Sequence, residues 1–286
     1  MMDKVRSQGF DRVFISIDGT SGLAGEVVRQ NLIVREIVSA YIKDNSLDWD
    51  LLFQEDRLGI VKNFTTSINQ AFEKVEYLCI LEDDCVPASG LLDYFKNVLT
   101  LSESNRVRMF TFFRPNLKKI SRGYFATHNP LMWGWGLSKG NWEDIESGIA
   151  PISPLKGLTK LKSLPFQSFY FSGYSRAISQ ESDALDALIS YYLLMNDYLV
   201  IGPPVSMISN IGYGSLATHT LEKSEYMGVA VSDWKPKDHD NHLKMNSFAV
   251  FKNDLTIARR MNQWKVHHLF SSYLKRMLLR RFIRTV

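Results

Sequence analysis

The N-terminal third of the chain alternates short apolar runs with longer segments of helical periodicity, and this alternation restricts the possible folds most strongly. Runs rich in β-branched and aromatic residues predict strands, whereas apolar residues spaced three and four apart predict helices. Strands and helices in alternation are typical of an α/β fold with a mainly parallel central sheet flanked by helices. The expected strands are Val13–Ile17, Trp49–Phe53 and Tyr77–Leu81, and the expected helices are Glu26–Ile42, Ile60–Val75 and one opened by Pro87.

The pattern is looser in the rest of the chain, where we expect the same domain to continue. No internal repeat divides the sequence, so we predict one domain over residues 1–255 and a tail over residues 256–286. The further expected strands are Val107–Phe113, Leu131–Leu137 and Tyr198–Ile201, and the further helices are Asn141–Ser147 and Ser182–Met195.

Acidic residues follow two of the predicted strands directly. Asp18, with Gly19, follows the first strand, and Glu82, Asp83 and Asp84 follow Tyr77–Leu81, a continuous apolar run that predicts a fully buried parallel strand. Ligands bind beyond the carboxyl ends of such strands. Three adjacent carboxylates repel one another unless a cation neutralises them, and Mg²⁺ or Mn²⁺ prefers such oxygen ligands. The alternative is an acidic turn that caps the following helix.

Residues around this acidic triplet resemble a known family. The segment from Leu81 to Pro87, followed by Leu91–Phe95, resembles the corresponding segment of GT-A (Rossmann-like) glycosyltransferases, notably the N-acetylglucosaminyltransferase-I type and related bacterial sugar transferases. The similarity extends in order over residues 5–220. Its other segments are Phe14–Gly19, Leu58–Gly59 with Asn63, Trp133–Gly136, Asn210–Gly214 and Ala217–Thr220.

The resemblance implies a role for each matching residue. The direct ligand of Mn²⁺ or Mg²⁺ would be Asp84, joined by His219. Asp186 or Asp183, on the helix from Ser182, would be the catalytic base, and we favour Asp186. The residues implied in nucleotide-sugar binding are Asp18, Gly19, Asn63, Glu82 and Asp83, and those implied on the acceptor side are Trp133, Gly134, Trp135 and Gly136.

Each of these residues also has an ordinary structural interpretation. An acid such as Asp186 on a helix is commonly just solvated, and a lone histidine such as His219 is commonly a satisfied structural residue. The two tryptophans, Trp133 and Trp135, alternate with glycines and could simply belong to the core. The chain also departs from the family at its start: Asp3–Gly9 resembles the end of the family's first helix, and the family's first strand has no counterpart here.

Charge and composition restrict the cellular setting. The net charge of +4 comes from a basic tail, which includes Lys275, Arg276, Arg280 and Arg281, so we expect no nucleic-acid partner. Apolar residues recur through this tail at helical spacing, which predicts an amphipathic helix on an anionic membrane surface or, alternatively, docked on the domain. Two cysteines, no secretory signal and no long apolar run predict a cytoplasmic protein, peripheral on the inner face of the membrane.

The leading functional hypothesis is therefore a metal-dependent, inverting glycosyltransferase. It would move a sugar from a nucleotide-sugar, expected to be a UDP-sugar, to a hydroxyl of a surface-glycan or lipid-linked glycan acceptor. The metal would stabilise the leaving diphosphate, and a carboxylate would take the acceptor proton. The alternatives are a nucleotidyltransferase with a similar core and a truncated, non-catalytic domain that binds glycans or a partner.

Overall fold

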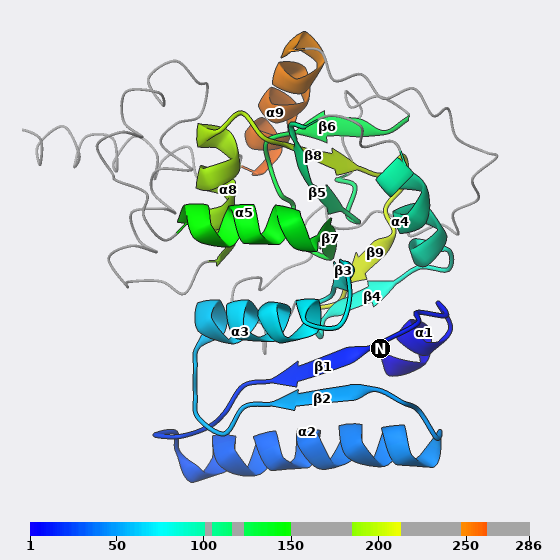
Figure 1. Cartoon of the computed structure of the whole chain (residues 1–286), viewed down its shortest axis with the longest axis vertical. Helices are drawn as coiled ribbons and strands as arrows, with labels where there is room; N and C mark the ends of the chain where they lie inside the picture. The colour runs from blue at the N-terminus through cyan, green and yellow to red at the C-terminus, as the bar shows by residue number, and fades with distance from the viewer. Residues whose placement is uncertain (101–104, 116–122, 150–184, 213–246, 262–286) are drawn as a thin grey trace, which may run out of the picture.

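The computed structural model describes residues 1–100, 105–115, 123–149, 185–212 and 247–261 (Figure 1). Within these residues, helices and strands are interspersed along the chain, so the protein is a mixed α/β structure.

The N-terminal part is a small layer around a pair of parallel strands. Strands β1 and β2 pair in register from Phe14 with Asp50 to Ile17 with Phe53. In Figure 1 the long helix α2 lies below this pair, and α3 lies above it. The elements of this part are α1 (Met2–Arg6), β1 (Phe14–Ile17), α2 (Gly25–Asp44), β2 (Asp50–Phe53) and α3 (Ile60–Phe72).

The rest of the described chain is built on a five-stranded sheet in the order β3-β7-β5-β8-β6. A separate two-stranded antiparallel sheet pairs β4 with β9. The strands are β3 (Tyr77–Ile80), β4 (Cys85–Pro87), β5 (Val107–Thr111), β6 (Phe125–Thr127), β7 (Trp135–Ser138), β8 (Leu199–Gly202) and β9 (Ile208–Asn210). The helices are α4 (Leu91–Thr100), α5 (Lys139–Ile149), α8 (Leu185–Met195) and α9 (Ser247–Met261).

The prediction of a mainly parallel sheet is wrong. Of the pairs in the five-stranded sheet, only β5 with β8 is parallel, and β3–β7, β5–β7 and β6–β8 are antiparallel. Strand β6 was not predicted at all, and β7 lies next to β3 and runs antiparallel to it. Both come from the middle of the chain, where the sequence pattern does not reveal how the strands are connected.

The prediction of a fully buried parallel strand at Tyr77–Leu81 is also wrong. Strand β3 is antiparallel to β7, lies at the edge of its sheet, and leaves Tyr77 54% exposed. The apolar run has a different cause: Leu78 and Ile80 pack on the core cluster around α3 and α5, whereas Cys79 and Leu81 pack on the cluster around α4. Both faces of the strand are covered, so apolar residues are favoured at every position whatever the strand direction.

Helix α4 begins later than predicted. Pro87 belongs to β4, and the helix starts at Leu91 after Gly90, whose φ of 83° suits glycine. The side chain of Gln8 accepts a hydrogen bond from the Leu91 N–H at 3.1 Å and donates one to the Ala88 carbonyl at 3.0 Å. The first backbone donor of α4 is thereby satisfied from the N-terminal part of the chain.

Helix α9 crosses the boundary that we expected at residues 255/256. Its Asp254 accepts hydrogen bonds from the backbone N–H of His128 at 2.9 Å and from Thr127, and Ile257 is fully buried beside Phe125. The first turns of α9 are therefore part of the folded body. Among the residues that the structure describes, no helix has both the length and the apolar character needed to cross a membrane.

Candidate metal centre

A tight turn after β3 brings two of the three predicted acids together. The backbone N–H of Cys85 donates to the carbonyl of Glu82 at 3.0 Å, which folds the turn back on itself. Ligand atoms of Glu82, Asp84 and Cys85 all lie within 4.8 Å of one another. Glu82 and Asp84 are half-buried, whereas Asp83 is exposed. The acidic triplet is thus a pair of converging carboxylates beside a thiol, with Asp83 turned to solvent.

The segment after β9 holds Asp84 in place. The N–H of Ile211 donates to the Asp84 carbonyl at 2.8 Å, and Cys85 pairs with Asn210 across the β4–β9 ladder. A Cβ on Gly212 would overlap the Asp84 carboxylate, so only glycine leaves room for this side chain. Two segments separated by more than a hundred residues in the sequence therefore build one site.

The site concentrates negative charge in a partly desolvated place. Burial, followed by the charges of Asp84, Asp186 and Asp83 in that order of effect, raises the pKa of Glu82 to about 7. Burial, followed by the Asp84 charge, also raises the pKa of the Cys85 thiol. No lysine or arginine in the described parts of the chain forms an ion pair with these acids. The carboxylates can hold a hard divalent cation, to which a neutral thiol is a weaker ligand.

Asp186 lies near this cluster, at the start of another element. It occupies the first turn of α8, is exposed to solvent, and is close enough to Glu82 for its charge to act on that group. The link between Asp186 and the acidic turn is electrostatic, since no hydrogen bond or ion pair between described residues joins them. The other candidate base, Asp183, and the candidate ligand His219 lie outside the described residues.

The predicted acceptor loop also reaches the site, although its two tryptophans differ. Gly134, with φ of 73°, lies against Leu81 and Ile208, directly beside the acidic turn. Trp133 is half-buried, with its ring edge-on to Phe113 at 4.8 Å. Trp135 is fully buried, so its ring offers no face to a sugar, and the core interpretation holds for it. The next glycine, Gly136, is confined by Phe95 and Phe112 and serves sheet packing.

Asp18 and its neighbours form a separate polar centre in the N-terminal layer. Its carboxylate accepts hydrogen bonds from the backbone N–H groups of Gly19 at 2.9 Å, Leu58 at 2.8 Å and Gly59 at 3.0 Å. Asn63, in the first turn of α3, is 3.3 Å from the hydroxyl of Ser16. No hydrogen bond or ion pair between described residues joins Asp18 to the acidic turn, so the structure does not bring these two predicted groups into contact.

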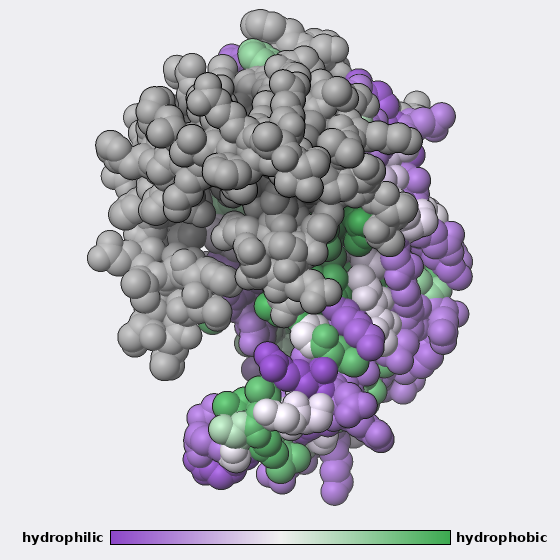
Figure 2. Space-filling model, turned by 90° about the vertical axis from the view of Figure 1, so that its left-hand side faces the viewer, coloured by the Kyte–Doolittle hydropathy of each residue, from purple (hydrophilic) through white to green (hydrophobic). Residues whose placement is uncertain are grey.

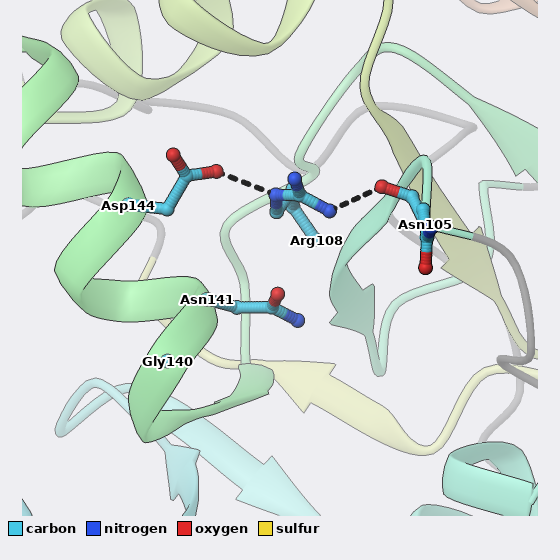
Figure 3. Close-up of a pocket in the computed structure, with 5 residues that line it drawn as sticks. All are labelled: Asn105, Arg108, Gly140, Asn141 and Asp144. Atoms are coloured by element: carbon cyan, nitrogen blue, oxygen red, sulfur yellow. Dashed lines mark hydrogen bonds and ion pairs between the residues drawn. The ribbon is translucent and has the colours of Figure 1, made fainter.

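A shallow polar pocket of about 310 Å³ lies at the other end of the sheet (Figure 3). Thr111 of β5 pairs with Trp135, which pairs with Ile80, so the acidic turn lies near the end of β5. The pocket instead contains Arg108, near the start of that strand. Its guanidinium donates to Asp144 at 2.6 Å, which joins β5 to α5. Because the charge is already paired, we interpret this pocket as a structural junction.

Comparison with protein-family models and with curated proteins finds no match to this chain. The site therefore rests on its own geometry. Sequence reasoning did not anticipate Cys85 as a member of the cluster or Gly212 as the residue that makes room for Asp84. The only sequence signals were that Cys85 adjoins the triplet and that Gly212 lies in one of the family-like segments.

Proposed function

We propose that the chain is a divalent-metal-dependent glycosyltransferase of the GT-A kind, which uses a nucleotide-sugar as donor. The observation that carries the proposal is the pair of half-buried carboxylates, Glu82 and Asp84, which converge without a described basic partner. Such a pair is costly unless a cation binds there, because each charge opposes the ionisation of the other.

The residues present suit Mn²⁺ or Mg²⁺. Asp84 and Glu82 would supply hard oxygen ligands. A metal held by few carboxylates has coordination positions left for the oxygens of a diphosphate. When bound, the metal would neutralise the charge that develops on the leaving diphosphate. Asp186, whose charge acts on Glu82 from a different element, would accept the proton of the acceptor hydroxyl.

The neighbouring elements support a transfer site open to two substrates. Asp83 is exposed beside the metal ligands, where a donor sugar could contact it. The loop at Trp133–Gly134 packs next to the same turn, on a separate segment of the chain. We assign Asp83 to the donor and Trp133 to the acceptor on this basis, together with the family resemblance.

Isothermal titration of UDP in the presence and absence of Mn²⁺ tests the proposal. We expect binding that requires Mn²⁺ and that weakens about 100-fold in Asp84→Asn, since a lost ligand costs at least as much as a lost supporting residue. Glu73→Gln removes one negative charge at the exposed end of α3 and serves as the matched control. Metal-independent UDP binding, or equal binding in Asp84→Asn, would contradict the metal role.

The products separate the remaining alternatives. A glycosyltransferase incubated with UDP-sugar, Mn²⁺ and water slowly releases UDP and free sugar. A nucleotidyltransferase given UTP and a sugar phosphate releases pyrophosphate instead. A binding domain releases neither, and that result would remove the enzymatic proposal while leaving the metal site in place.

A further inference from the structure

A histidine that directly follows β6 lies between two carboxylates from different elements. The Nδ1 atom of His128 is 2.7 Å from a carboxylate oxygen of Asp254 in α9, and its Nε2 atom is 3.1 Å from a carboxylate oxygen of Asp197, in the turn between α8 and β8. The histidine side chain is only 11% exposed. One largely buried ring therefore joins the end of β6 both to α9 and to the turn after α8.

Other groups already hold both carboxylates as acceptors. Asp254 accepts hydrogen bonds from the hydroxyl of Thr127 and from the backbone N–H of His128. Asp197 forms an ion pair with Arg106, ahead of β5, at 2.7 Å. A neutral imidazole carries one N–H and can donate to only one ionised carboxylate, whereas an imidazolium donates to two. The contacts of the His128 ring are therefore those of its protonated form.

The charges around the ring also favour protonation. Burial opposes the positive charge, but hydrogen bonds and attraction from Asp254, and then from Asp197, outweigh it, so the pKa of His128 lies above its ordinary value of 6.5. No other acid in the described parts of the chain forms an ion pair with the ring. Arg106 weakens the pull of Asp197, which is 63% exposed, so Asp254 is the stronger partner.

Helix α9 is attached to β6 around the same carboxylate. Next to Asp254, the side chain of Asn253 donates to the Ala126 carbonyl at 2.9 Å. One turn further on, Ile257 is fully buried beside Phe125. These contacts place the imidazole among the groups that hold α9 on the sheet, so its charge acts directly on the docking of this helix.

The ring and the acidic turn lie at opposite edges of the five-stranded sheet. Strand β6 is the last strand at one edge, and β3, which the acidic turn follows, is the last strand at the other. Helix α9 stands at the end of the molecule away from the N-terminal layer (Figure 1), whose mixture of apolar and polar side chains forms the lower end of Figure 2. The ring therefore has no part in the chemistry proposed at the acidic turn.

We propose that His128 is a pH-sensitive clamp, which as an imidazolium holds α9 and the turn after α8 on β6 and loosens both when it loses its proton. The neutral ring keeps its Nδ1–H for Asp254, so the contact of Asp197 with the unprotonated Nε2 is lost first. Because the pKa is raised in the folded state, the stabilisation is complete below pH 6.5 and is lost as the pH rises through the folded-state value. This inference goes beyond the proposed function and does not depend on it.

Titration of the imidazole by NMR, on the full chain, tests the charge of the clamp. The signal of His128 is identified by its absence in His128→Gln. We expect a pKa above 6.5 in the wild type and a lower pKa in Asp197→Asn, in which asparagine tolerates the φ of 58° at this position. Asp48→Asn, which removes an exposed charge elsewhere, should leave the pKa unchanged. A wild-type pKa at or below 6.5, or an equal fall in both variants, would overturn the proposal.

Amide hydrogen exchange connects this charge to α9. We expect the protection factors of the Asp254 and Ile257 amides to fall about tenfold between pH 6 and pH 9 in the wild type, the scale of one hydrogen bond to a charged group. His128→Gln should show the weaker protection already at pH 6. Glu82 titrates in both proteins, so the difference between them isolates His128.

Asp197→Asn gives a second comparison that keeps the histidine. Its protection in α9 should begin to fall at a lower pH than in the wild type, whereas that of Asp48→Asn should follow the wild type. An α9 whose protection is independent of pH in the wild type would overturn the clamp. The same pH dependence in His128→Gln as in the wild type would also overturn it, because another group would then be responsible.

Discussion

The two acidic centres of this protein are built in opposite ways. The carboxylate of Asp18 accepts three backbone hydrogen bonds, and its own carbonyl accepts from Asn31 and Arg35, each at 3.1 Å. The carboxylate of Asp84 accepts a bond only from the neighbouring Cys85 thiol among the described residues, at 3.3 Å. Glu82, beside it, has its pKa raised by burial and by surrounding charge.

This difference separates an acid with protein partners from the acids of the proposed metal site. Donors of the protein itself already compensate the charge of Asp18, so its removal should damage the fold. The charges of Glu82 and Asp84 are compensated by no described donor of similar strength, so either a proton on Glu82 or the proposed cation relieves their repulsion. Both groups follow an apolar strand, and their sequence positions alone gave no means of telling them apart.

The largest effect should come from Asp18→Ala. The change leaves the N–H groups of Leu58 and Gly59 without their acceptor, in a loop that Gly19 packs tightly against Asp56. We expect the free energy of unfolding to fall by about 3 kcal/mol, the scale for several hydrogen bonds to one charged group. Urea denaturation measures this change.

Asp11→Ala is the matched control for that experiment, because Asp11 is exposed and near the same strand. Its unfolding free energy should stay within about 0.5 kcal/mol of the wild type. If Asp18→Ala were as stable as this control, the contrast between the two acidic centres would be lost.

The next effect is a dependence of metal-free stability on pH. The pKa of Glu82 in the folded state is about 7, above its ordinary value of 4.5, so the folded state binds this proton more tightly than the unfolded state. The free energy of unfolding therefore falls as the pH rises from the unfolded-state pKa of Glu82 through its folded-state pKa. Allowing for the partial exposure of Glu82, we expect a loss of about 2 kcal/mol between pH 5 and pH 8 in EDTA.

Comparing the wild type with Glu82→Gln isolates this contribution from other titrating groups. The variant cannot ionise, so its stability should change with pH by about 2 kcal/mol less than that of the wild type. Saturating Mn²⁺ should remove most of the wild-type loss, because the cation stabilises the ionised form. A parallel pH dependence in the two proteins would show that Glu82 is not the group responsible.

The sequence predicted the N-terminal elements well because their apolar spacing is regular and their connections are short. Helix α3 was expected to start at Ile60 and does, and the acidic turn was correctly placed directly after β3. Strand direction in the five-stranded sheet could not be predicted, since an apolar run such as Tyr77–Leu81 reports only that both faces are covered. Pairing partners depend on contacts between distant segments, which no local pattern encodes.

Only part of the candidate site was predicted, and its arrangement was not. The sequence placed Glu82 and Asp84 together, yet only the structure shows Asp83 exposed and Cys85 turned inward. Trp135 looked the same as Trp133 because both adjoin glycines, and burial in three dimensions distinguishes them. Residue type alone does not show which of several neighbouring side chains faces the interior and which faces solvent.

A smaller effect should follow from Gly212→Ala. The added Cβ would overlap the Asp84 carboxylate, which must then move from the position where it converges with Glu82. We expect Mn²⁺ affinity, measured by calorimetry, to fall about tenfold, the scale for disturbing a residue that orients a metal ligand. Gly140→Ala is the control, since nothing lies within 4 Å of a Cβ there. Unchanged affinity in Gly212→Ala would mean that Asp84 is not a ligand.

The smallest effect on metal affinity should come from Asp83→Asn. This variant tests whether Asp83 is a metal ligand like the other two acids. Asp83 is exposed and lies outside the cluster of converging ligand atoms, so its charge acts on the site as a neighbouring, screened charge and not as a ligand. We expect the affinity for Mn²⁺ alone to change by less than about twofold, as for a screened surface charge. Affinity for UDP-sugar measured with saturating Mn²⁺ should fall more than affinity for UDP, because we assign Asp83 to the sugar. If Mn²⁺ binding fell as far as in Asp84→Asn, all three acids would be ligands, and the site would have to rearrange when the cation binds.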